Sequence, residues 1–287
     1  MPSPRLLVIE GNTAEARAKH VEAGGTILSE GYAALLRHLL PGAAVDICYP
    51  ADPGTNLPGG DISDYDGVAI TGSALNVYDG GPAIAPQIEL ARAVMASGTP
   101  LFGSCWGLQV ITVAAGGTVR ANPKGREIGI GRRIAVTAAG GDHLIYAGKA
   151  ATFDAVTVHL DEVETLAPGT TVLARNAHSE VQAAEISYDG GVAWGVQYHP
   201  EFSLADIAVI IRRYGSQLVR EGFFADIAAR DAYTADLEML QHEQGLKPIA
   251  WRYGIDDTVL DARVRTPEIA NWITHQVLPA RAKRGRG

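Results

Sequence analysis

One pentapeptide limits the local fold more than any other part of the chain. It is Gly103-Ser104-Cys105-Trp106-Gly107, which follows the mainly apolar run 99–102 and precedes the run 108–113. The two glycines let a strand and a helix approach closely, so we expect strand, tight turn and helix with the cysteine at the apex. A helix start after the cysteine favours the thiolate, because free N–H groups and the helix dipole stabilise negative charge. The alternative is a buried structural cysteine beside packing glycines.

A second segment supplies groups that a thiol nucleophile needs. It reads Trp194-Gly195-Val196-Gln197-Tyr198-His199-Pro200-Glu201-Phe202. His199 and Glu201 project to the same side of an extended chain, and Pro200 excludes a helix there. A nucleophilic cysteine requires a base and a group that orients the base. We therefore predict a triad of Cys105, His199 and Glu201. The alternative is a histidine that ends a strand beside a solvent-facing glutamate.

The order of apolar segments predicts an α/β fold. In the N-terminal half, strands are expected at 6–9, 45–49 and 67–70, and helices at 27–40 and 85–96. This alternation is typical of a mostly parallel central sheet flanked by helices. Shorter strands follow and predict a small antiparallel extension: 127–136, 151–159, 171–175, 181–188 and 192–198. Ser203 is a good N-cap for the next helix.

The chain divides into a large domain and a helical tail. We predict one domain over residues 1–222 and, over residues 223–287, a C-terminal helical appendage of two or three helices packed on the same core. A basic cluster at Arg281, Lys283, Arg284 and Arg286 is expected to be a solvated tail. Phosphate binding is the lesser alternative for this cluster.

Composition excludes several classes of function. A formal charge of -8 over 287 residues disfavours nucleic-acid binding, which requires a basic face. Two cysteines and the absence of a signal peptide or membrane span predict a cytoplasmic protein without membrane contact. The eight histidines show no His-Glu-x-x-His spacing and the cysteines no Cys-x-x-Cys spacing, so we expect no metal site. No phosphate-binding loop is present, and we expect no cofactor.

The two segments together resemble the class I glutamine amidotransferases, the triad or GATase1-type family. The runs 103–109 and 197–202 carry the resemblance, and Thr71-Gly72-Ser73 and Val77-Tyr78-Asp79 stand in place of the family's glycine turn. The likeness is nearest to the glutaminase domain of GMP synthase and its stand-alone relatives, and it covers about residues 5–220. It implies the flavodoxin-like fold of this family.

The resemblance also implies a reaction. Cys105 would attack the side-chain amide of glutamine, release ammonia and form a γ-glutamyl thioester, with His199 moving protons and Glu201 orienting it. The resemblance places the oxyanion hole at Gly72, Ser73 and the amide of Trp106. It implies substrate contacts by four residues, which are Gln109, Gly107, His159 and Asp161.

Two positions depart from the family pattern. Relatives carry two glycines and a proline where this chain has Gly72-Ser73-Ala74. A serine can donate its N–H to the oxyanion, but at greater cost if its φ is positive. Leu160 also replaces a glycine in the segment that borders the pocket. A γ-glutamyl substrate other than glutamine is therefore conceivable.

The chain lacks a domain that would use ammonia. It contains neither a Gly-x-x-x-x-Gly-Lys-Ser/Thr loop nor a Ser-Gly-Gly-x-Asp-Ser loop. Either a separate synthetase subunit receives the ammonia, or the protein is a self-sufficient hydrolase. One alternative is a γ-glutamyl hydrolase or peptidase that acts on γ-glutamyl conjugates. Another is a non-catalytic regulatory or docking subunit that keeps the fold.

Overall fold

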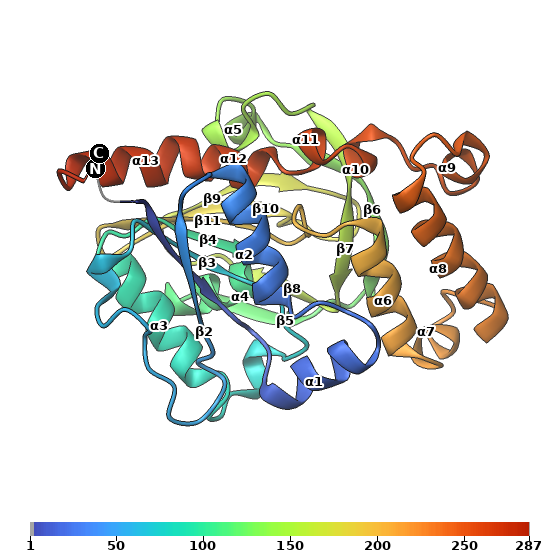
Figure 1. The fold of residues 1–287 in the computed structure, drawn as a ribbon, viewed down its shortest axis with the longest axis horizontal. Coiled ribbons are helices and arrows are strands. Elements are labelled where there is room, and N and C mark those ends of the chain that lie inside the picture. Colours follow the sequence, from blue (N-terminus) through green and yellow to red (C-terminus); the bar gives the residue numbers. More distant parts are fainter. Residues whose placement is uncertain (1–2, 287) are drawn as a thin grey trace.

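A nine-stranded sheet forms the centre of the protein in the computed structural model, which describes residues 3–286 (Figure 1). Its strand order is β2-β1-β3-β4-β11-β10-β9-β6-β7, and β5 and β8 form a separate pair. The strands are β1 Arg5–Ile9, β2 Ala44–Cys48, β3 Gly67–Ile70, β4 Leu101–Ser104, β5 Thr118–Ala121, β6 Glu127–Val136, β7 Thr152–His159, β8 Asp161–Thr165, β9 Thr170–Arg175, β10 Ala183–Tyr188 and β11 Gly191–Val196.

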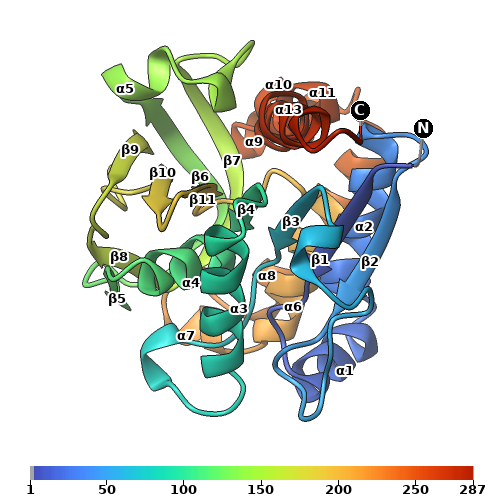
Figure 2. The same ribbon diagram turned by 90° about the vertical axis from the view of Figure 1, so that its left-hand side faces the viewer.

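The helices cover both faces of this sheet and one end of it (Figures 1 and 2). They are α1 Ala14–Glu22, α2 Leu28–Leu39, α3 Ala85–Ala96, α4 Trp106–Ala114, α5 Ala138–Gly141, α6 Leu204–Tyr214, α7 Gln217–Arg220, α8 Ile227–His242, α9 Lys247–Tyr253, α10 Asp257–Leu260, α11 Ala262–Arg265, α12 Pro267–Trp272 and α13 Leu278–Lys283. Of the described helices, none has both the length and the apolar character needed to cross a membrane.

The sheet is parallel in one half and antiparallel in the other. Strands β2, β1, β3, β4 and β11 pair in parallel. From β11 through β10, β9 and β6 to β7 every pairing is antiparallel. The predicted parallel sheet with an antiparallel extension is therefore confirmed. The sequence missed α1, β5 and β8, because α1 buries only His20 and the two short strands carry too few apolar residues for a clear pattern.

Alternating side chains of the buried strands pack into two separate cores, one on each face of the sheet. In β1, Leu7 and Ile9 pack with α3 and α4, whereas Leu6 and Val8 pack with α2. This follows from the two-residue period of a strand, which sends neighbours to opposite faces. A third apolar cluster joins α6 to α8 and the segments that follow α8. The parallel strands are covered on both faces, as expected for such a sheet.

The C-terminal helices pack on the same sheet that carries the pentapeptide. Trp272 of α12 is fully buried, and its ring centroid lies 5.8 Å from that of Phe102 in β4. A Cβ atom on Gly67, at the start of β3, would lie 2.7 Å from a methyl carbon of Val277. Figures 1 and 2 show α12 and α13 running across one end of the sheet, beside the N-terminal segment.

The expectation of a solvated basic tail is wrong for three of its four residues. Arg281 forms an ion pair of 2.6 Å with Asp66, and the two side chains are only 7% and 1% exposed. Arg284 donates to the backbone oxygen of Tyr65 at 2.9 Å, and Arg286 lies 3.5 Å from Asp66. Lys283 alone is exposed. The error arises because the guanidinium groups bind the buried carboxylate of Asp66 and the backbone oxygen of Tyr65, both more than two hundred residues away.

We expect Arg281→Ala to lower the free energy of unfolding by about 3 kcal/mol, because it leaves the carboxylate of Asp66 buried without its main partner. Urea unfolding followed by tryptophan fluorescence measures this loss. Arg263→Ala is the control, since the Arg263 side chain is 90% exposed in its pair with Asp261. An equal, negligible effect of both substitutions would contradict a structural role for the buried pair.

Candidate active site

Cys105 occupies a strained turn between β4 and α4. Its φ is 53° and its ψ is -101°, a conformation that non-glycine residues adopt only when the surroundings enforce it. A Cβ on Gly103 would lie 2.4 Å from the carbonyl carbon of Gly107, and one on Gly107 would lie 2.6 Å from the oxygen of Ile70. Strand and helix therefore meet with no space for a side chain. The expected turn is present, with the cysteine at its apex.

The thiol of Cys105 has two polar neighbours and little solvent contact. The residue is 4% exposed. Its Sγ receives a hydrogen bond of 3.4 Å from Nε2 of Gln197 and lies 3.6 Å from the backbone oxygen of Val158, which accepts the thiol proton. Gln197, which follows β11, also accepts a hydrogen bond of 3.3 Å from Gln109. The amide of Gln197 is thus placed to stabilise negative charge on the sulfur.

His199 is held on three sides. Its Nδ1 lies 2.7 Å from Oε1 of Glu201, and its ring stacks on Phe202 with centroids 4.0 Å apart and planes 3° apart. On the third side, a Cβ on Gly72 would lie 2.7 Å from Cε1 of the ring. Within the described residues, the buried Nε2 of His199 has no hydrogen-bond partner. The histidine therefore keeps one ring nitrogen available for a proton transfer.

The charges around His199 favour its protonated form. Burial alone would lower the pKa of the imidazole, but the neighbouring charge of Glu201 opposes burial, and Cys105 adds to that effect. The resulting pKa is about 10. The structure thus brings Cys105, His199 and Glu201 together, with a protonated imidazole beside the sulfur at neutral pH.

The turn at Ser73 has an ordinary backbone. Ser73 is absent from the described non-glycine residues with positive φ, so the strain considered for a serine at this position does not arise. The N–H groups of Ser73 and Trp106 make no hydrogen bond within the described part of the chain. Gly72 is required for a different reason, since any side chain there would strike His199. Two backbone donors are thus free near the thiol.

Asn12, which the sequence analysis missed, holds this turn. Its Oδ1 accepts from the N–H of Ala74 at 3.0 Å, and Ser73 Oγ donates to the oxygen of Gly11 at 2.8 Å. Asn12 is itself bound through its N–H and its Nδ2 to the buried carboxylate of Glu10, each at 3.0 Å. These bonds fix the turn, although it lacks the proline that the family resemblance leads one to expect there. No local sequence pattern predicts these bonds, because the loop after β1 is distant in sequence from the turn that it holds.

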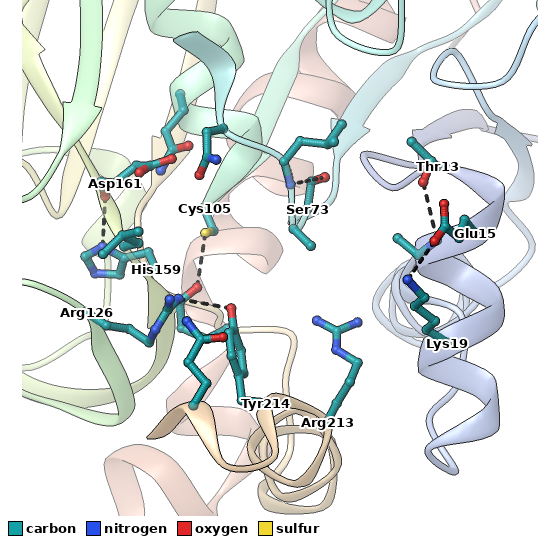
Figure 3. A pocket seen from close by; sticks show the side chains of 18 residues that line it. Thr13, Glu15, Lys19, Ser73, Cys105, Arg126, His159, Asp161, Arg213 and Tyr214 are labelled. Atoms are coloured by element: carbon teal, nitrogen blue, oxygen red, sulfur yellow. Dashed lines mark hydrogen bonds and ion pairs between the residues drawn. The ribbon is translucent and has the colours of Figure 1, made fainter. Parts of the chain in front are cut away.

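A cavity of about 570 Å³ opens at Cys105 (Figure 3). Three of the predicted substrate residues line it, namely Gln109, His159 and Asp161. Gly107, the fourth, does not line the cavity, because it is packed against Ile70 beneath the turn.

Hydrogen bonds hold the wall of this cavity that carries His159 and Asp161. His159 is fixed between the backbone oxygen of Asp161 at 3.0 Å and Glu127 at 2.9 Å. The carboxylate of Asp161 accepts from the hydroxyl of Tyr78 at 2.9 Å.

The C-terminal helices grip the segment that carries His199. Glu268 of α12 accepts a hydrogen bond of 2.5 Å from the hydroxyl of Tyr198 and pairs with Lys149 at 2.7 Å, both charged side chains being buried. Arg265 of α11 donates to the oxygen of Pro200 at 3.3 Å. These contacts reach the residues on either side of His199. Sequence motifs gave no sign of them.

No group of three or more histidine, cysteine, aspartate or glutamate residues within 3–286 is arranged to hold a metal ion.

Comparison with known proteins identifies the family. Residues 35–212 match the family described as glutamine amidotransferase class-I. The chain belongs to this family. A γ-glutamyl-L-1-hydroxyisopropylamide hydrolase from Pseudomonas sp is 35% identical over all of this chain and 97% of its own length. A glutamine-hydrolysing GMP synthase from Thermomicrobium roseum is 32% identical over 68% of this chain, which spans only 32% of that synthase.

A solved amidotransferase structure has the same fold. The glutamine amidotransferase from Thermotoga maritima superposes with a TM-score of 0.64, covering 96% of this chain and 98% of that one at 17% identity. The flavodoxin-like fold of the class I family, predicted from the two motifs, is therefore confirmed. As a member of this family with such a hydrolase relative, the protein is a cysteine-type C–N hydrolase.

We expect Gly72→Ala to lower kcat about 100-fold, because the new methyl group displaces the His199 ring and small errors in position at a reacting group are costly. Steady-state kinetics on a γ-glutamyl amide measures the loss. Gly31→Ala is the control, since a Cβ at Gly31 meets no atom within 4 Å. Full activity of Gly72→Ala would show that catalysis does not depend on the present position of the His199 ring.

We expect wild-type kcat/KM to persist to alkaline pH and to fall as His199 loses its proton near pH 10. Glu201→Gln removes the opposing charge, so the alkaline limb should move to lower pH. The charge of Glu201 also stabilises the folded protein when His199 is protonated. This stability is fully present below the unfolded pKa of 6.5 for histidine and is lost as the pH rises through about 10. Kinetics and unfolding between pH 6 and 11 measure both effects.

Glu180→Gln is the matched control for this titration, because the side chain of Glu180 is 79% exposed and its one ion pair among residues 3–286 is with Arg175. An alkaline limb that stays in place in Glu201→Gln would assign the titration to another group.

Proposed function

We propose that the protein hydrolyses γ-glutamyl amides on its own, without passing ammonia to a synthetase. The cavity at Cys105 carries this proposal, because its volume of about 570 Å³ leaves room for a substituted amine beside a γ-glutamyl group. The full-length likeness to a γ-glutamyl amide hydrolase supports it, since that likeness includes the C-terminal helices. By contrast, the likeness to GMP synthase covers 68% of the chain.

In the proposed reaction, Cys105 Sγ attacks the γ-carbonyl carbon. A C–S bond forms, and the carbonyl electrons move to oxygen, where the N–H groups of Ser73 and Trp106 donate hydrogen bonds. Such donors are worth several kcal/mol in acyl transfer, about 3 kcal/mol each. Protonated His199, which holds the proton that the thiol has given up, passes it to the departing nitrogen, and the C–N bond breaks. This leaves a γ-glutamyl thioester and a free amine.

Water completes the reaction. His199, now neutral, accepts a proton from the attacking water, and the C–S bond breaks to leave the sulfur as a thiolate beside the protonated imidazole. Glutamate is released. Glu201 keeps the imidazole in the orientation that serves both steps. Gln109, His159 and Asp161 are proposed to bind the glutamyl group, with the carboxylate of Asp161 facing its ammonium.

The second candidate is a glutaminase subunit with a separate synthetase partner. The likeness to a glutamine-hydrolysing GMP synthase favours it. The two candidates share the chemistry at Cys105 and differ in the leaving group, which is ammonia in one and a substituted amine in the other. For either candidate we propose a cytoplasmic location, where thiols stay reduced.

Product analysis tests the proposed function. We expect the purified protein alone to release amine and glutamate from γ-glutamyl-L-alaninol with a kcat/KM at least tenfold above that for ammonia release from glutamine. Cys105→Ala is the inactive control. Acid quenching and mass spectrometry should find a γ-glutamyl adduct on Cys105. Rapid ammonia release from glutamine with intact γ-glutamyl amides would instead identify a glutaminase.

A further inference from the structure

The cavity extends to both sides of the nucleophile. Figure 3 shows Asp161 and His159 on one side of Cys105, and Arg213 of α6 with Lys19 of α1 on the other. Thr13 and Glu15 also lie on this second side. We call this part of the cavity the α1–α6 side. Nothing in the reaction described above uses it.

Among residues 3–286, the lysine and arginine side chains that line the cavity pair with carboxylates, with one exception. Lys19 pairs with Glu15 at 2.6 Å, and Arg126 pairs with Glu221 at 3.0 Å. Arg213 has no carboxylate partner among residues 3–286, and its one polar contact is Nδ1 of His20 at 3.5 Å. Burial lowers the pKa of its half-buried guanidinium, as expected for a cation without a counter-ion.

An uncompensated, half-buried guanidinium in a substrate cavity favours an anionic ligand. Removing a charge from water is costly unless an opposite charge and hydrogen bonds replace the solvent. Arginine offers a rigid pair of donors that matches a carboxylate in bidentate fashion. Arg213 is therefore suited to a carboxylate of the substrate rather than to a neutral group.

The position of Arg213 indicates which carboxylate this is. The ammonium and carboxylate of a γ-glutamyl group share one carbon atom, so both must bind on one side of the nucleophile. Asp161, which faces the ammonium in the proposed function, lies across Cys105 from Arg213 (Figure 3). The guanidinium is thus left for the part of the substrate beyond the scissile amide.

We propose that the α1–α6 side is the subsite for the leaving amine and that Arg213 binds a carboxylate carried by that amine. The preferred substrates are then γ-glutamyl amino acids. This inference rests on the proposed function and adds the identity of the leaving group. In the reaction, His199 gives the proton to the departing nitrogen, and the released product is an amino acid.

A series of three amides and glutamine tests the subsite. γ-Glutamyl-L-alanine, γ-glutamyl-L-alaninol and γ-glutamylisopropylamide carry a carboxylate, a hydroxymethyl and a methyl group at the same position. For the wild type we expect kcat/KM to fall in that order, with γ-glutamyl-L-alanine first. The amine released from each amide is measured by chromatography, and glutamine turnover by ammonia release.

Arg213→Gln should lower the ratio of kcat/KM for γ-glutamyl-L-alanine to that for γ-glutamylisopropylamide about 10- to 100-fold, the effect of losing hydrogen bonds to a charged group. Arg213→Lys should keep part of the preference, because the charge remains without the bidentate geometry. Arg212→Gln is the matched control. Arg212 neighbours Arg213 on α6 but pairs with Glu238 and does not line the cavity.

Each other outcome overturns the inference in a recognisable way. An equal loss on all four substrates would place Arg213 at the shared glutamyl group or in the fold, and thermal unfolding separates these two cases. An unchanged ratio would exclude a carboxylate contact. If the wild type cleaves glutamine and none of the amides, the proposed function itself fails. If the amides are cleaved and the ratio does not move, only the subsite fails.

Discussion

The contact of α4 with β3 and β4 is the constraint on which the rest of the site depends. Helix and strands meet backbone to backbone at Gly103 and Gly107, where no Cβ fits. This contact enforces the positive φ of Cys105 and sets the direction of the free N–H group of Trp106. The strained backbone of Cys105 persists because the densely packed atoms around it leave no room for another conformation. The reactive thiol is thus fixed by closely packed backbone in the core.

The histidine side of the site is fixed differently. His199 and Glu201 follow the end of β11, in a stretch with no regular structure, and the bonds from Glu268 and Arg265 supply the rigidity that a helix or strand would give. The buried pair of Glu268 and Lys149 belongs to this arrangement. Breaking such a pair is costly, which makes it a firm support for Tyr198. Nucleophile and base are therefore held by different sets of contacts, although the strands that precede them, β4 and β11, pair directly.

The sequence predicted what short segments determine. The turn at Cys105, the spacing of His199 and Glu201, and the alternation of strands and helices in the parallel half each depend on neighbours along the chain, so local patterns identify them. Asn12 and Arg213 depend on contacts between distant segments, and nothing in their surroundings distinguishes them from ordinary loop and helix residues. The basic tail was misjudged for the same reason, because its carboxylate partner precedes β3.

The contacts of the C-terminal helices with the residues on either side of His199 have a consequence for folding during synthesis. A ribosome makes the chain from its N-terminus, and domains fold as their segments emerge. The cysteine turn is complete when β4 and α4 are available, whereas the support for its base lies in α11 and α12, which are synthesised much later than α4. A nascent or truncated chain therefore holds a thiol without a firmly placed base. The base is therefore firmly placed only after α11 and α12 have been synthesised.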